Sequence, residues 1–124
     1  MIPELDDLSA IKTCIKKYQE GSARGDRKLL EEAFLPSARM VGWFNGNCMD
    51  VPISTFFEIA EGNAQSEAGY QAELQSIQIT GTAAVATLAE NAYLKHDFVD
   101  YFALIKTADG WKIANKLFHG DPAD

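Results

Sequence analysis

Apolar residues recur every three or four positions near the start of the chain and every two positions in its second half. The first spacing predicts a helix over residues 4–20, because it places one apolar stripe along the helix surface. The members of this stripe are Leu5, Leu8, Ile11, Ile15 and Tyr18. Gly21 is the expected end of this helix. A second, shorter helix is expected after Asp26, a good N-cap residue, and before Pro36, which cannot continue a helix.

Turn residues divide the remainder into strands and one further helix. Asn45-Gly46 and Asp109-Gly110 predict hairpins, because tight two-residue turns favour these residue pairs. A third helix is expected from Ser54, its N-cap, to Glu61. The expected strands cover residues 38–44, 47–51, 70–80, 83–94, 97–106 and 111–118, with a polar loop over 63–69.

The order of these elements predicts an α+β protein, with three helices packed on an antiparallel sheet. At 124 residues, the chain is expected to form a single domain, 1–124, with a sizeable core. Its net charge of −7 argues against binding to nucleic acid or to an anionic membrane. Because neither a secretory signal nor a long apolar stretch is visible, we expect a cytoplasmic location.

The last strands are apolar on both faces, so both faces should be covered. We assign the bulkier face to the helices, because large apolar groups contribute most burial energy. That face is expected to carry Trp111, Ile113, Leu117, Phe102, Leu104 and Val85, together with Asn91, Asp100 and Asn115. The other, expected to meet a second subunit, carries Ala84, Ala86, Leu88, Val99, Ala103, Ile105, Ala114 and Phe118, with Glu90, Tyr101 and Lys116. A β-bulge would exchange the faces beyond it.

Asp100 is the first candidate for a functional side chain, because a carboxylate in a doubly covered strand must be paired, protonated or hydrogen-bonded. It is either a structural residue bonded to Asn91, Asn115 or a helix hydroxyl, or an acid or hydrogen-bond anchor at the bottom of a pocket. Tyr18 is either a core residue bonded to backbone or a side chain that reaches over a cavity mouth.

Other chemistry is not indicated by the sequence. Lys116 is expected at a rim or a dimer face, paired with Glu90. Cys14 and Cys48 lack metal-ligand spacing and are expected to be free thiols. We find no catalytic triad, no glycine-rich phosphate loop and no metal spacing, so neither a metal nor a cofactor is expected.

Four short motifs are distributed along the chain. They are Tyr18-x-x-Gly21-x-x-x-Gly25-Asp26, Ala33-Phe34-x-Pro36-x-Ala38, Asp100-Tyr101-x-x-Leu104 and Gly110-Trp111-Lys112-Ile113-x-Asn115-Lys116-x-Phe118. With them the chain resembles the nuclear transport factor 2-like superfamily, and more narrowly its bacterial "putative lumazine-binding" family. The resemblance implies a cystatin-like conical barrel, in which a strongly bent antiparallel sheet wraps around three helices. It also implies a cavity at the wide end and a homodimer formed through the sheet.

Three functional hypotheses follow. The first is a protein that binds a small apolar or aromatic ligand in a pocket. Its expected lining is Tyr18, Trp43, Phe57, Asn91, Asp100, Phe102, Trp111, Asn115 and Leu117. The second rests on the resemblance to ketosteroid isomerases, polyketide cyclases and dehydratases, which implies an enzyme using Asp100 and Tyr18. In the isomerases a carboxylate on the first strand acts as the base, and residues 39–43 of this chain contain no carboxylate. The third is an interaction module without a pocket.

Overall fold

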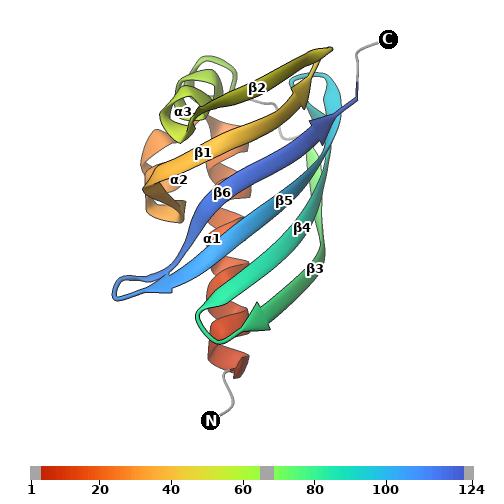
Figure 1. Cartoon of the computed structure of the whole chain (residues 1–124). Helices are drawn as coiled ribbons and strands as arrows, with labels where there is room; N and C mark the ends of the chain where they lie inside the picture. Colours follow the sequence, from red (N-terminus) through yellow and green to blue (C-terminus); the bar gives the residue numbers. More distant parts are fainter. Residues whose placement is uncertain (1–3, 65–68, 122–124) are drawn as a thin grey trace.

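Three helices cover one face of a six-stranded, strongly curved sheet (Figure 1). The structure is a computed structural model that describes residues 4–64 and 69–121. The helices are α1 (Glu4–Arg24), α2 (Arg27–Ala33) and α3 (Ile53–Gly62). The strands are β1 (Phe34–Phe44), β2 (Asn47–Pro52), β3 (Gln71–Thr80), β4 (Ala83–Tyr93), β5 (His96–Thr107) and β6 (Gly110–Gly120). The predicted α+β class is confirmed.

The strand order across the sheet is β2-β1-β6-β5-β4-β3. Four of the neighbouring pairs are antiparallel, but β1 and β6 run parallel. The sheet is therefore mixed, where the sequence predicted an antiparallel one. The reason is the long connection between β2 and β3, which contains α3. The chain passes through α3 to the far edge of the sheet and meanders back, so that β6 arrives beside β1 in the same direction.

The first helix is longer than predicted, because Gly21 lies inside it and does not end it. A Cβ atom at Gly21 would come within 2.8 Å of the Leu30 side chain, so the missing side chain lets α2 pack closely against α1. Gly25, with φ +67°, ends the helix in the left-handed conformation typical of that position. Asp26 caps α2 as predicted, since its side chain accepts a hydrogen bond from the Leu29 backbone amide.

Both predicted hairpins are present. In the first, Asn45 and Gly46 have φ of 53° and 83°, which is the left-handed pair that a tight turn between twisted strands requires. In the second, Thr107 pairs with Gly110 across the turn. The α3 helix begins at Ile53, directly after Pro52, and its N-cap makes no side-chain hydrogen bond, so the predicted cap at Ser54 is wrong. The predicted loop 63–69 lies partly outside the described residues.

Two β-bulges decide which side chains face the helices. Between β5 and β6, Ala103 pairs with Asn115 but Leu104 pairs with Ile113, which leaves Ala114 as an extra residue. The second bulge separates the pairs Glu90–Phe98 and Tyr93–His96 of β4 and β5. At this bulge Ala92 has φ 59°, and its amide donates to Asp97 Oδ1 at 3.0 Å.

The bulges correct the predicted faces. Trp111, Ile113, Phe102, Leu104 and Asp100 are buried against the helices, as predicted. The residues that also lie on this face, against prediction, are Ala84, Ala86, Leu88, Glu90, Lys116 and Phe118. Those predicted on this face but turned outward are Val85, Asn91, Asn115 and Leu117. Each bulge inserts residues that break the two-residue alternation, and every side chain beyond it changes face.

Candidate functional site

Helix α1 positions a fully buried phenol against the sheet. The ring of Tyr18 packs edge-on against Phe102 at 4.9 Å between centroids and stacks with Phe56 of α3 at 5.7 Å. Its hydroxyl donates to Glu90 Oε1 at 2.9 Å. Tyr18 is therefore a core residue, as one of the two predictions had it, but its partner is a carboxylate of β4 and not the backbone.

The Glu90 carboxyl group is completely buried and is held by two tyrosines. Its second oxygen, Oε2, accepts a short hydrogen bond from Tyr70, which directly precedes β3. Burial raises the pKa of Glu90 well above its usual range, and the neighbouring charge of Asp100 raises it further. The proton-bearing form of Glu90 is thus favoured, and in that form the carboxyl group can donate a hydrogen bond.

Asp100 forms a buried ion pair with Lys116. The Lys116 Nζ lies 3.3 Å from Asp100 Oδ1, and the two side chains are 4% and 0% exposed. Neither Asp100 oxygen meets the geometry of a well-aligned hydrogen bond within the described part of the chain, although the neighbouring Glu90 carboxyl group also interacts with this side chain. The structure thus pairs Asp100 with a lysine predicted to lie on the opposite face, and not with Asn91 or Asn115.

The strand register brings the two acidic side chains together. Leu88 pairs with Asp100 and Phe98 pairs with Glu90, so the two carboxyl groups are diagonal neighbours on one face of β4 and β5. The ammonium of Lys116 also lies over aromatic rings, 4.4 Å from the Phe118 centroid and 4.9 Å from that of Phe56. Such cation–π contacts stabilise a charged amine that has been removed from water.

A pocket opens onto this cluster. Its cavity volume is about 60 Å³, enough for roughly four waters. The lining residues are Met40, Phe44, Met49, Phe56, Ile59, Glu90, Tyr93, Leu94, Phe98, Lys116 and Phe118. The walls are therefore apolar except for a carboxyl group, an ammonium and a phenol. The hydroxyl of Tyr93 is buried and has no hydrogen-bond partner among the described residues, so it can offer a hydrogen bond to a bound molecule.

None of the nine residues predicted to line the pocket is among these lining residues. Tyr18 and Asp100 contact its polar members through Glu90 and Lys116, and Phe102 packs against Tyr18. Trp111 is buried elsewhere and donates to Asp7 at 3.0 Å. The others lie away from the pocket: Trp43 and Leu117 are 53% and 45% exposed, Asn91 and Asn115 belong to the outer face, and Phe57 borders a separate hollow beside α2.

Sequence reasoning missed the two charged residues that line the pocket. Glu90 could have been found, because it continues the two-residue period of Ala84, Ala86 and Leu88. Leu88 is the largest apolar side chain of that strand before Glu90, and its size favours placing this set of residues against the helices. Lys116 could not, because its position depends on the bulge at Ala114, which has no clear signal in the sequence.

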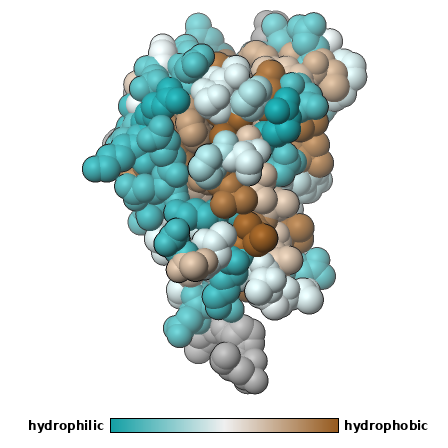
Figure 2. Space-filling model, turned by 60° about the vertical axis from the view of Figure 1, so that its left-hand side comes forward, coloured by the Kyte–Doolittle hydropathy of each residue, from teal (hydrophilic) through white to brown (hydrophobic). Residues whose placement is uncertain are grey.

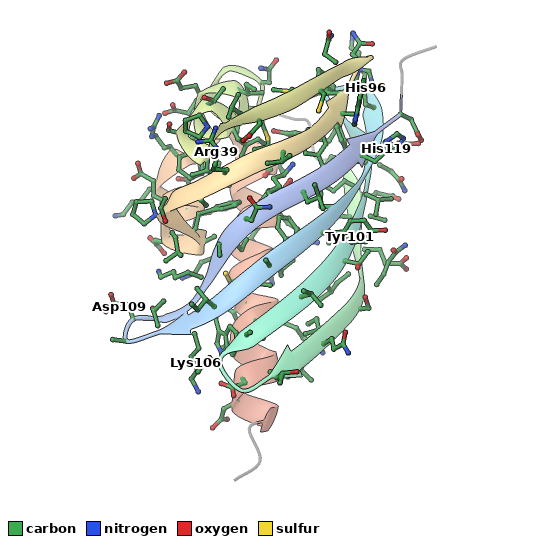
Figure 3. All side chains as sticks on the ribbon, in the orientation of Figure 1. Arg39, His96, Tyr101, Lys106, Asp109 and His119 are labelled. Carbon is green, nitrogen blue, oxygen red and sulfur yellow. The ribbon has the colours of Figure 1, made fainter. Side chains whose placement is uncertain are left out.

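The remaining reactive side chains do not join the site. Cys14 and Cys48 are free, and burial raises the pKa of the Cys14 thiol to about 11. His96 and His119 lie together at one end of the sheet (Figure 3), where the His96 ring is 2.9 Å from the Asp121 carbonyl oxygen. Across residues 4–64 and 69–121, no group of three His, Cys, Asp or Glu side chains could hold a metal ion, and no helix could cross a membrane.

Comparisons with known proteins agree with this architecture. A solved NTF2-like protein of unknown function from Shewanella baltica is 25% identical, with a TM-score of 0.89 over 99% of this chain and 100% of its own. A ketosteroid isomerase-like protein from Erwinia carotovora shares the fold at 16% identity, with a TM-score of 0.70 over 94% of this chain and 98% of its own.

Sequence comparison gives a narrower result. Aldolase FrzH of a Cladobotryum species is 30% identical over 122 residues, which are 96% of this chain and 93% of that protein. The family described as putative lumazine-binding matches residues 6–119. Since this match spans nearly all of the described elements, the chain belongs to the putative lumazine-binding family and has an NTF2-like fold.

Proposed function

We propose that this protein binds a small, largely apolar molecule bearing a carbonyl or hydroxyl group in the pocket beneath α3. The observation that carries the proposal is the composition of the pocket, whose apolar walls end at Glu90, Lys116 and Tyr93. A few polar groups among apolar walls are typical of small-molecule sites, because they orient a ligand that hydrophobic contact holds. The family description, putative lumazine-binding, also supports a small-molecule ligand.

The charges of the pocket favour a ligand that accepts hydrogen bonds. Glu90 is favoured in its proton-bearing form, because its pKa is raised, and the Lys116 ammonium carries only donors. The unpartnered Tyr93 hydroxyl can donate as well. A carbonyl or hydroxyl oxygen accepts from such groups, and a small apolar ring beside it would contact Phe98 and Phe118. At about 60 Å³, the pocket suits a small ring better than an extended molecule.

A substitution in the pocket wall tests this proposal. Met49→Trp is expected to fill the pocket and weaken binding of cyclohexanone by roughly tenfold or more, since about 1.4 kcal/mol of lost contact has that effect. Val51→Trp is the matched control, because Val51 lies two residues along the same face of β2 but outside the pocket. Saturation-transfer NMR measures both affinities. Equal weakening by the two variants, or no binding to the unmodified protein, would contradict the proposal.

The second candidate function is acid–base catalysis on the bound molecule. The observation that favours it is the close set of Glu90, Asp100 and Lys116, because a carboxyl group with a raised pKa beside other charged groups, as at Glu90, is typical of active sites. It keeps Asp100 and Tyr18 of the sequence hypothesis, now acting through Lys116 and Glu90. The name of the relative aldolase FrzH also supports carbonyl chemistry, since an aldol reaction requires loss of a proton beside a carbonyl group.

Deuterium exchange tests this second candidate. In heavy water, the protein is expected to accelerate exchange of the protons beside the cyclohexanone carbonyl, because a general base or acid typically contributes about 10²-fold or more. Glu90→Gln should abolish most of that acceleration, whereas Glu73→Gln on the exposed side of β3 should not. Proton NMR follows the loss of signal. Exchange at the buffer rate, with binding intact, would leave a binding protein without this activity.

We also propose that two copies of the chain pair through the outer face of the sheet. The helices cover only the inner face, and five large apolar side chains of the outer face are exposed: Trp43, Val85, Tyr101, Ile105 and Leu117. Tyr101, labelled in Figure 3, lies on this side, and Figure 2 shows hydrophobic surface gathered beside a hydrophilic flank. Leu88 and Phe118, which the sequence placed in this interface, are buried inside instead.

Ala103→Arg is expected to convert such dimers into monomers. Ala103 is exposed near the middle of β5, where an unpaired charge would be removed from water at the contact between copies. Ser9→Arg adds the same charge to the exposed side of α1 and should leave the dimer intact. Sedimentation velocity gives the mass of each variant. A stable monomer of the unmodified protein at micromolar concentration would refute the pairing.

A further inference from the structure

Lys116 is the only buried lysine among the residues that the structure describes. Its amine belongs to the pocket wall, whereas Lys106, Lys112 and Lys17 use their ammonium groups in exposed ion pairs or hydrogen bonds. Imine-forming proteins use a lysine amine as the nucleophile toward a bound carbonyl group, and Lys116 is placed in the pocket wall where such a group would bind.

The partner of Lys116 can also accept its proton. Asp100 Oδ1 is 3.3 Å from the Lys116 Nζ, and the neighbouring Glu90 carboxyl group also interacts with the Asp100 side chain. At 3.3 Å the Nζ and Oδ1 atoms are close enough for direct transfer of a proton from nitrogen to oxygen. A shift of one proton between these atoms therefore exposes a lone pair to the pocket.

A second acid stands beside the same space. Glu90 lines the pocket, and it is positioned by hydrogen bonds from Tyr18 and Tyr70 to its two oxygens. Like Asp100, it lies on the inner face of the β4–β5 pair; Glu90 faces the pocket itself, and Asp100 reaches the same amine through its ion pair with Lys116. In the course of the reaction each acid takes one proton from nitrogen and gives one to oxygen.

We propose that Lys116 captures an aldehyde or ketone in the pocket as an imine, with Asp100 and Glu90 moving the protons; this rests on the proposed small-molecule site. Asp100 first takes a proton from the ammonium, and the free amine forms a bond to the carbonyl carbon. The electron pair of the C=O bond moves to oxygen, which takes the proton of Glu90. Glu90 then recovers a proton from nitrogen, Asp100 returns its proton to the hydroxyl group, and water leaves. The products are a protonated imine and water, with both acids restored and no other reactant consumed.

The ligand of such a site is an aldehyde or a ketone. An alcohol or an amide could occupy the pocket but would not bond to the amine, whereas a ketone of similar size would. The alternative is that Lys116 only neutralises Asp100, in which case ketones and alcohols would bind equally and reversibly. These two roles differ in whether a covalent adduct forms.

Chemical trapping separates them. The unmodified protein is incubated with acetone and sodium borohydride, which reduces an imine to a stable secondary amine, and peptide mass mapping locates the isopropyl group. We expect Lys116 to be labelled roughly tenfold or more faster than Lys112 and the other exposed lysines. Acetylacetone should independently form an enaminone at the same residue, visible as a new near-ultraviolet absorbance.

A matched pair of variants completes the experiment. Lys116→Arg keeps a positive charge opposite Asp100 but cannot form an imine, so both signals should disappear, while Lys112→Arg should retain them. Because mapping of the unmodified protein locates the label directly, the result does not depend on the folding of Lys116→Arg. Labelling confined to exposed lysines, with cyclohexanone still bound, overturns the inference and leaves the proposed binding function standing. No ketone binding at all overturns both.

Discussion

Lys116→Met is expected to lower the free energy of unfolding by about 3–5 kcal/mol, the usual cost of removing one partner of a buried ion pair. The variant leaves the Asp100 carboxylate, which is 0% exposed, without its counter-charge. It also removes the cation from the ring of Phe118. Methionine fills most of the space of the lysine stem, so the loss arises mainly from the charge and not from a cavity. Urea denaturation at neutral pH measures it.

Adding Asp100→Asn to Lys116→Met should restore part of this loss. The asparagine has the size of the aspartate but carries no charge, so roughly 2 kcal/mol should return, with the remainder reflecting an amide that lacks partners. Lys112→Met, at a lysine that only donates to the exposed Glu32 carbonyl oxygen, should change stability by about 0.5 kcal/mol or less. Additive losses in the double variant would contradict the buried pairing.

Glu90→Gln is expected to stabilise the protein increasingly as the pH rises. The pKa of Glu90 is raised in the folded protein, first by burial and then by the charge of Asp100. Above about pH 4.5 the unfolded chain therefore releases this proton while the folded protein keeps it. Rising pH thus favours the unfolded chain by about 1.4 kcal/mol per pH unit, until the raised pKa is reached. Glutamine has no titratable proton, so the free energy of unfolding of the Glu90→Gln variant does not fall with pH for this reason.

The difference between the variant and the unmodified protein is the quantity to measure. The groups near Glu90 are Asp100, Lys116, Tyr18, Tyr70 and Tyr93. The tyrosine pKa values are raised by burial and lie above this range, and Asp100 and Lys116 are present in both proteins. Thermal or urea unfolding between pH 4 and 8 gives the difference at each pH, with Glu73→Gln controlling for the change in net charge. A flat difference would mean that Glu90 is not held in its proton-bearing form.

Local sequence rules predicted the elements well. The hairpin at Asn45-Gly46 and the cap at Asp26 depend on the conformational preferences of a few neighbouring residues, and both are present. Gly21 shows the limit of such rules, because a glycine that would normally end a helix is needed there for close contact with Leu30. The parallel pairing of β1 with β6 was missed for a similar reason, since it depends on where the chain returns after α3.

The candidate site was only partly predictable. Asp100 and Tyr18 were identified correctly as buried polar residues, because a carboxylate or phenol within apolar alternation needs a partner. Their partners, Glu90 and Lys116, were assigned to the opposite face. The bulges at Ala92 and Ala114 cause this error, since each reverses the alternation beyond it. Ala92 even adopts φ 59°, a conformation that an alanine gives no reason to expect.

The central claim is that a small carbonyl-bearing molecule binds in the pocket that contains Glu90 and Lys116, and methionine methyl NMR tests it most directly. The sequence contains three methionines, and two of them, Met40 and Met49, line this pocket. With ¹³C-labelled methionine methyl groups, titration of cyclohexanone is expected to shift the Met40 and Met49 signals together, along one saturating curve. Unchanged Met40 and Met49 signals at saturating cyclohexanone would contradict the account.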